Sequence, residues 1–151
     1  MSLDQEVEIL RQIPIFANID TAKLKLMCFA SERLIYRAGQ VLFSQGDVGD
    51  AAYIIIDGEA EVMVDSPGGP LTVAVLRRND IVGEIAILCD VPRTATIKAA
   101  TELVTLKITK DLFFRMVMDF PDMGVEIMRV LAHRLEQTTA QLREARTGSA
   151  G

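Results

Sequence analysis

The stretch Asp80–Ala99, DIVGEIAILCDVPRTATIKA, decides the fold and contains the clearest candidate site. Gly83 has no Cβ, so the chain can turn sharply there and a ligand can approach the backbone closely. We expect residues 84–88 to form a short helix whose first amides have no partner within the helix and therefore suit a phosphate. Residues 90–92 then turn the chain, and residues 93–97 alternate as in a strand.

Arg93 and Glu84 are the charged residues that give this stretch its chemistry. Arg93 can return to the mouth of the short helix, where its planar guanidinium matches two phosphate oxygens. A carboxylate beside a phosphate is unusual unless the same ligand also offers a hydroxyl donor, as a sugar phosphate does. The alternative is a protein without this ligand, in which Glu84 and Arg93 pair with each other.

The pattern G-E-I-A-I-L…P-R-T-A-T-I resembles the phosphate-binding cassette of cyclic-nucleotide-binding domains. The resemblance extends from about Ile13 to Leu142. It implies an α+β, mainly β chain: a jelly-roll (double-stranded β-helix) barrel flanked by N-terminal helices and a long C-terminal helix. It also implies a regulatory module that binds cAMP or cGMP, without metal and without catalysis.

The resemblance assigns a role to each cassette residue. Glu84, next to Gly83, takes the ribose 2′-OH, and Arg93 takes the cyclic phosphate. The amides around Ile85, Ala86 and Ala95 complete the anion site.

Two features bear on the base, and the second of them favours cAMP over cGMP. Thr94 resembles a residue that favours guanine in cGMP-dependent kinases, although its hydroxyl equally suits the phosphate. Thr138-Thr139 follows the cassette arginine at nearly the same distance as a Thr-Ser pair in bacterial members of the family, where one residue reaches the adenine across a dimer. The alternative is two surface threonines.

The rest of the chain predicts a single domain of four parts. An N-terminal helical segment occupies residues 1–31, the β-roll with its cassette (80–99) residues 32–108, C-terminal helices residues 109–146, and a flexible tail residues 147–151. Helical spacing predicts helices over 4–12, 22–30, 110–118 and about 122–146. A period of two, with glycine-rich turns between the segments, predicts short strands at 34–36, 41–43, 52–56, 60–64, 71–76 and 103–106.

Composition excludes several other classes of protein. The net charge of −5 makes nucleic-acid binding unlikely for this chain alone. No apolar run is long enough for a membrane span and no signal peptide is evident, so we expect a cytoplasmic protein. Cys28 and Cys89 stand among apolar residues and are interpreted as reduced core thiols, with no spacing typical of a metal site.

The predicted long helix, residues 122–146, is the part of the chain that we expect to transmit ligand binding to a partner. Its residues Met128, Leu131, Leu135, Thr138 and Leu142 step by three and four, which indicates a homodimer through this helix or, alternatively, a helix lying on its own barrel. Pro121 marks a hinge, so we expect the ligand to reorient residues 122–146 and to signal to a downstream protein that the sequence does not identify. The alternatives are the ligand-binding part of a transcription regulator and a scaffold with a dead pocket.

Overall fold

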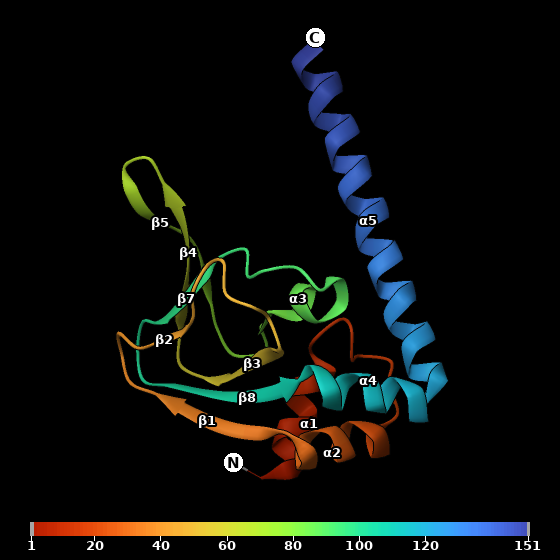
Figure 1. The fold of residues 1–151 in the computed structure, drawn as a ribbon. Coiled ribbons are helices and arrows are strands. Elements are labelled where there is room, and N and C mark those ends of the chain that lie inside the picture. Colours follow the sequence, from red (N-terminus) through yellow and green to blue (C-terminus); the bar gives the residue numbers. More distant parts are fainter. Residues whose placement is uncertain (1, 151) are drawn as a thin grey trace.

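The computed structural model describes residues 2–150, without the side chains of residues 85 and 147–150. Two four-stranded antiparallel sheets form a jelly-roll barrel (Figure 1), which confirms the predicted fold class. One sheet has the order β1 (Glu32–Tyr36), β8 (Leu103–Thr109), β3 (Ala51–Asp57), β6 (Ile81–Val82). The other has the order β2 (Val41–Phe43), β7 (Thr96–Ala99), β4 (Ala60–Ser66), β5 (Gly69–Leu76).

Helices cover one end of the barrel, as predicted. They are α1 (Leu3–Arg11) and α2 (Thr21–Ala30) before the strands, α3 (Glu84–Cys89) within the cassette, and α4 (Lys110–Asp119) and α5 (Pro121–Ala150) after them. Thr109 caps α4, since its hydroxyl accepts a hydrogen bond from the Leu112 amide at 3.1 Å. The predicted break is confirmed as well, because Phe120 leaves the helical conformation and Pro121 opens α5.

Strand β3 separates the two parts of the core. Ala52, Ile54 and Ile56 on one face join the large cluster formed with the helices, and Ile55 on the other face joins the smaller cluster between the sheets. Both faces are therefore buried, which explains why this strand is almost continuously apolar. Ile87 of α3 belongs to the same large cluster as Met123 and Ile127 of α5, so one continuous core connects the cassette with the start of the last helix.

Helix α5 leaves the barrel after its first turns (Figure 1). Met123 and Ile127 are buried, whereas from Leu135 to Arg146 every residue is exposed. The prediction of a helix lying on its own barrel is therefore wrong for this half. Residues 147–150, where the sequence predicts a flexible tail, continue α5 to Ala150. Gly151 lies outside the described residues.

Two further expectations need correction. Strand β7 begins at Thr96 rather than Arg93, because the Arg93 backbone pairs with the loop after β2: its amide donates to the Asp47 carbonyl, and its carbonyl accepts from the Gly46 amide, both at 2.8 Å. Cys28 is buried as predicted, but Cys89, at the last position of α3, is exposed.

The turn between β3 and β4 provides a test of the fold. Gly58 has φ +91°, and a Cβ there would collide with the Glu102 carbonyl oxygen. We expect Gly58→Ala to lower the free energy of unfolding by about 2 kcal/mol or more, since left-handed strain and the clash add. Gly68→Ala is the control, because nothing lies within 4 Å of that position. Equal urea-denaturation midpoints for the two variants would contradict this.

Candidate functional site

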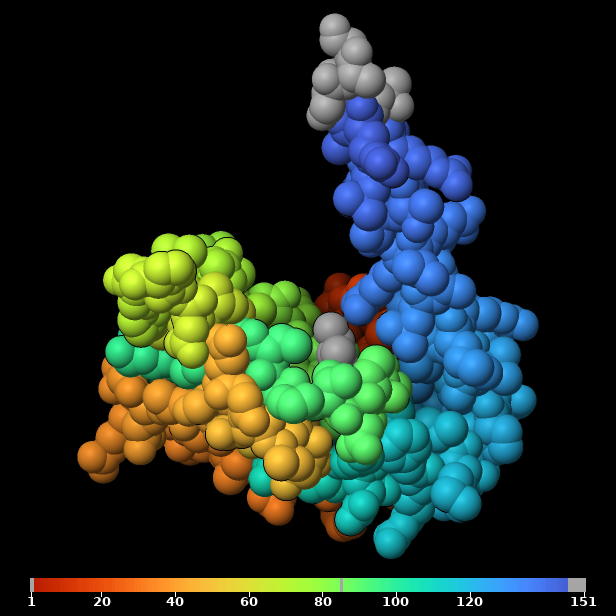
Figure 2. All heavy atoms as spheres, turned by 45° about the horizontal axis from the view of Figure 1, so that its top comes forward, coloured from red at the N-terminus to blue at the C-terminus, as the bar shows by residue number. Residues whose placement is uncertain are grey.

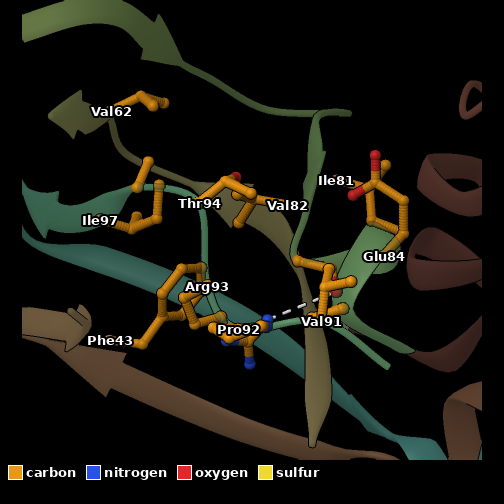
Figure 3. A pocket seen from close by; sticks show the side chains of 13 residues that line it. Phe43, Val62, Ile81, Val82, Glu84, Val91, Pro92, Arg93, Thr94 and Ile97 are labelled. Atoms are coloured by element: carbon orange, nitrogen blue, oxygen red, sulfur yellow. Dashed lines mark hydrogen bonds between the residues drawn. The ribbon is translucent and has the colours of Figure 1, made fainter. Parts of the chain in front are cut away.

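A pocket of about 150 Å³ opens between the sheets and the N-terminus of α3. Apolar side chains form most of its wall, and Arg93, Glu84 and Thr94 supply the polar groups (Figure 3). In the space-filling view the cassette forms the floor of a hollow, with the β4–β5 ribbon and α5 rising on either side of it (Figure 2). Such a mixture of apolar wall and few polar groups is typical of a small-molecule site.

Arg93 is the centre of this pocket. Its side chain is only 5% exposed, although it follows the turn at Pro92 and precedes β7. Nη2 donates to the Ala51 carbonyl at 2.7 Å and Nη1 to the Gly83 carbonyl at 3.3 Å. Nε is buried without a hydrogen-bond partner. A guanidinium has five N–H donors, so the site holds a cation with unused donors, which suits an anionic ligand.

The surroundings of Arg93 explain how a cation is kept there. Burial lowers the pKa of Arg93, and the nearby ionisable groups of Tyr53, Asp50 and Asp47 oppose that shift. The guanidinium carbon also lies 3.9 Å from the centroid of the Phe43 ring, within the range of a cation–π contact. The two main-chain carbonyls, the nearby aspartates and the Phe43 ring together stabilise the charge of the guanidinium in place of water.

Glu84 stands on the opposite side of the pocket from Arg93 (Figure 3). Burial raises the pKa of its carboxyl group, while its own backbone amide and the charge of Arg134 act in the other direction. The ion pairs among the described side chains do not join Glu84 to Arg93. Glu84 and Arg93 therefore form no ion pair across the pocket, and each can contact a different part of a ligand.

Two glycines make room for the arginine. Gly83 has φ +90°, and a Cβ there would collide with Arg93 Nη1. A Cβ on Gly49 would collide with the Ala86 Cβ and would lie 3.3 Å from Arg93 Nε. Any larger residue at either position therefore fills the space in which the guanidinium sits.

The structure brings most of the predicted site residues together. Gly83, Glu84, Ala86, Arg93, Thr94 and Ala95 all line the pocket. Ile85 lies in the first turn of α3, and its side chain is outside the described residues. Thr138 and Thr139 lie on the exposed half of α5 and do not line the pocket; their hydroxyls donate to the Arg134 and Leu135 carbonyls at 2.9 Å.

The sequence analysis missed three groups at the site: the Phe43 ring, Gly49 and the Ala51 carbonyl. A main-chain carbonyl leaves no mark in the sequence. Gly49 stands in a glycine-rich stretch typical of a turn, so its spacing from Gly46 is the only signal that the sequence offers for its place in the site. Phe43 lay in a strand that alone does not indicate which way the ring points.

Other kinds of site find no support in the described part of the chain. No group of three His, Cys, Asp or Glu side chains is arranged to hold a metal ion among the described residues. Within the same residues, each helix is too short or too polar to cross a bilayer.

Comparison with known proteins identifies the family. The family model described as the cyclic nucleotide-binding domain matches residues 33–120, more than half of the chain. The chain therefore belongs to the cyclic nucleotide-binding domain family, and the sequence resemblance is confirmed.

Two of the relatives illustrate the similarity. The chain is 33% identical over 109 residues to a cAMP-dependent protein kinase regulatory subunit of Schizosaccharomyces pombe, with 72% of this chain and 26% of that protein covered. It is 27% identical over 136 residues to a CRP-like cAMP-activated global transcriptional regulator of Mycobacterium tuberculosis, covering 89% of this chain and 61% of that protein. The chain thus spans about a quarter of the first relative and three fifths of the second.

Solved structures show the same fold. The N-terminal domain of a transcriptional regulator from Streptomyces coelicolor A3(2) has a TM-score of 0.80 and 30% identity, covering 86% of this chain and 94% of that one. The regulatory domain of Toxoplasma gondii PKA, crystallised with cAMP, has a TM-score of 0.73 and 29% identity, covering 78% of this chain and 45% of that one.

The raised pKa of Glu84 gives a pH-dependent prediction. The folded protein holds this proton more tightly than the unfolded chain, so the stabilisation is present below the ordinary glutamate pKa of about 4.3 and is lost as pH rises through the raised value. We expect Glu84→Gln to gain stability relative to wild type as pH increases across that window. Thermal melts from pH 4 to pH 8 measure it, with the exposed Glu136→Gln as control. A difference that stays constant with pH would contradict it.

Proposed function

We propose that this domain is a cyclic-nucleotide sensor that binds cAMP in preference to cGMP and works without catalysis. The observation that carries the proposal is the buried guanidinium of Arg93, which has an unpartnered Nε in a pocket that also holds Glu84. Leaving a buried charged donor without a partner costs free energy. A ligand that offers a phosphate to Arg93 and a hydroxyl to Glu84 removes that cost.

Each polar group then has a role. Arg93 holds the cyclic phosphate, together with the amides of Ile85 and Ala86 in the first turn of α3 and that of Ala95. Glu84 accepts a hydrogen bond from the ribose 2′-OH. Burial disfavours the charged form of Glu84 in the unliganded protein, so a hydroxyl donor compensates for lost hydration and is bound selectively.

Two observations bear on the preference for adenine. The names of both relatives specify cAMP. Thr138 and Thr139 are exposed on α5 and absent from the pocket lining, so their contact with a base requires α5 to move or a second copy of the chain to contribute them. We propose a homodimer through α5, where Met128, Leu135 and Leu142 are each more than 60% exposed.

The signal is proposed to pass from α3 to α5. Ile87 packs in the same cluster as Phe113, Met123 and Ile127, so a shift of α3 changes the support of α4 and α5. The non-helical Phe120 is the hinge between those helices. The cluster is thus proposed to have two packing arrangements, one without ligand and one with ligand. Ligand binding shifts the equilibrium between them.

A second function is favoured by one observation. The domain covers 94% of the N-terminal domain of the Streptomyces coelicolor transcriptional regulator, at 30% identity. The same sensor would then be the effector-binding part of a transcription regulator. Sequencing the complete reading frame distinguishes the two, because a regulator requires a DNA-binding domain in the same polypeptide.

Ligand binding is tested by thermal shift with cAMP and with cGMP. The melting temperature should rise with nucleotide concentration, as mass action requires. By calorimetry, Arg93→Ala should weaken binding roughly thirty- to several-thousand-fold, the equivalent of ~2–5 kcal/mol for a buried charge pair, whereas Thr94→Ala should cost about 1 kcal/mol. No shift with either nucleotide at millimolar concentration would favour the dead-pocket scaffold. Equal losses of affinity in Arg93→Ala and Thr94→Ala would show that Arg93 does not contact the phosphate.

Coupling to α5 is tested by hydrogen exchange. With cAMP bound, amides from about Arg134 to Arg143 should exchange markedly more slowly, because the ligand orders the exposed half of α5. Arg93→Ala at the same nucleotide concentration is the control and should show no such change. Protection confined to residues 83–99 would show that the domain binds its ligand without passing the signal to this helix.

A further inference from the structure

An irregularity in β2 aims the Phe43 ring into the site. In a regular strand, Val41 and Phe43 would point to the same face. Val41 pairs with Lys98 and is 47% exposed, but the register shifts between Val41 and Phe43, so Phe43 pairs with Ile97, which is 1% exposed. Such bulges re-aim a side chain and occur often beside functional sites.

The Arg93 guanidinium lies over the face of the re-aimed ring. The ring centroid lies 3.9 Å from the guanidinium carbon, and Figure 3 shows Phe43 beside Arg93 on the wall of the pocket. The Tyr53 ring packs against Phe43 with centroids 5.8 Å apart and an interplanar angle of 35°. This contact limits how far the Phe43 ring can turn.

Phe43 supplies a restraint that the hydrogen bonds do not. The carbonyls of Gly83 and Ala51 hold the two Nη atoms, but a guanidinium held only at that edge can still tilt about it. A ring packed against the guanidinium prevents the tilt. It also keeps water from one side of the cation, which strengthens the remaining charge-assisted bonds.

We propose that Phe43 is a positioning residue, which fixes the plane of the Arg93 guanidinium so that its Nε edge stays turned toward the ligand phosphate. This inference rests on the proposed function, since it assigns Phe43 a part in the same site. It predicts that Phe43 acts through Arg93 and not through the fold.

The stacking itself can be measured without nucleotide. In the NMR spectrum of the unliganded protein, the Arg93 side-chain protons over the ring should be shifted upfield by its ring current. Phe43→Leu should abolish that shift, Phe43→Tyr should keep it, and Val41→Ala, on the exposed side of the same strand, should leave it unchanged. An Arg93 spectrum that is identical in wild type and Phe43→Leu would overturn the inference whatever the protein binds.

The effect on binding is measured by calorimetry with cAMP. Phe43→Leu should weaken binding roughly 2- to 30-fold, the range expected for a cation–π contact, and Phe43→Tyr should restore most of it. In an Arg93→Ala background, which has no guanidinium to orient, Phe43→Leu should change the affinity less than 2-fold. The same loss in both backgrounds would show that Phe43 acts on the ligand or the fold, and would overturn the inference while leaving the proposed function in place. Wild-type protein that binds neither cAMP nor cGMP would instead overturn the proposed function, and this inference with it.

Discussion

A guanidinium can be buried in an apolar roll only if other groups replace the water around it. Arg93 meets this constraint through the Ala51 carbonyl at the start of β3, the Gly83 carbonyl before α3 and the ring of Phe43 in β2. Its backbone is fixed by the loop of Gly46 and Asp47. Three segments of the chain therefore converge on this side chain while a loop holds its backbone, and the shape of the pocket follows from their convergence.

The second constraint is the separation of charge across the pocket. Glu84 and Arg93 have opposite charges, and the cheapest arrangement of two such buried groups is usually a direct ion pair. Here they stand apart, one with its pKa raised by burial and the other with an unpartnered Nε. The unliganded domain thus keeps two unfavourable groups, which one ligand with a phosphate and a hydroxyl can relieve together.

Local features of the fold could be predicted from the sequence, and long-range ones could not. The cassette turn at Gly83 and the break at Phe120 depend on neighbouring residues alone. The aim of Phe43 depends on a register shift against β7, which lies more than fifty residues further on. Cys89 ends a six-residue helix, where apolar neighbours do not ensure burial. The role of Thr138 and Thr139 depends on where α5 packs, which no local pattern specifies.

The most direct test of the account is a calorimetric titration of wild type and Glu84→Gln with cAMP and with 2′-deoxy-cAMP. The central claim is that Arg93 and Glu84 bind the two ends of one sugar phosphate. Wild type should then bind the deoxy ligand roughly ten- to a hundred-fold more weakly, as expected for loss of a hydrogen bond to a charged group, and Glu84→Gln should show a much smaller difference. Equal affinity of wild type for both ligands, or the same difference in both proteins, would contradict the claim.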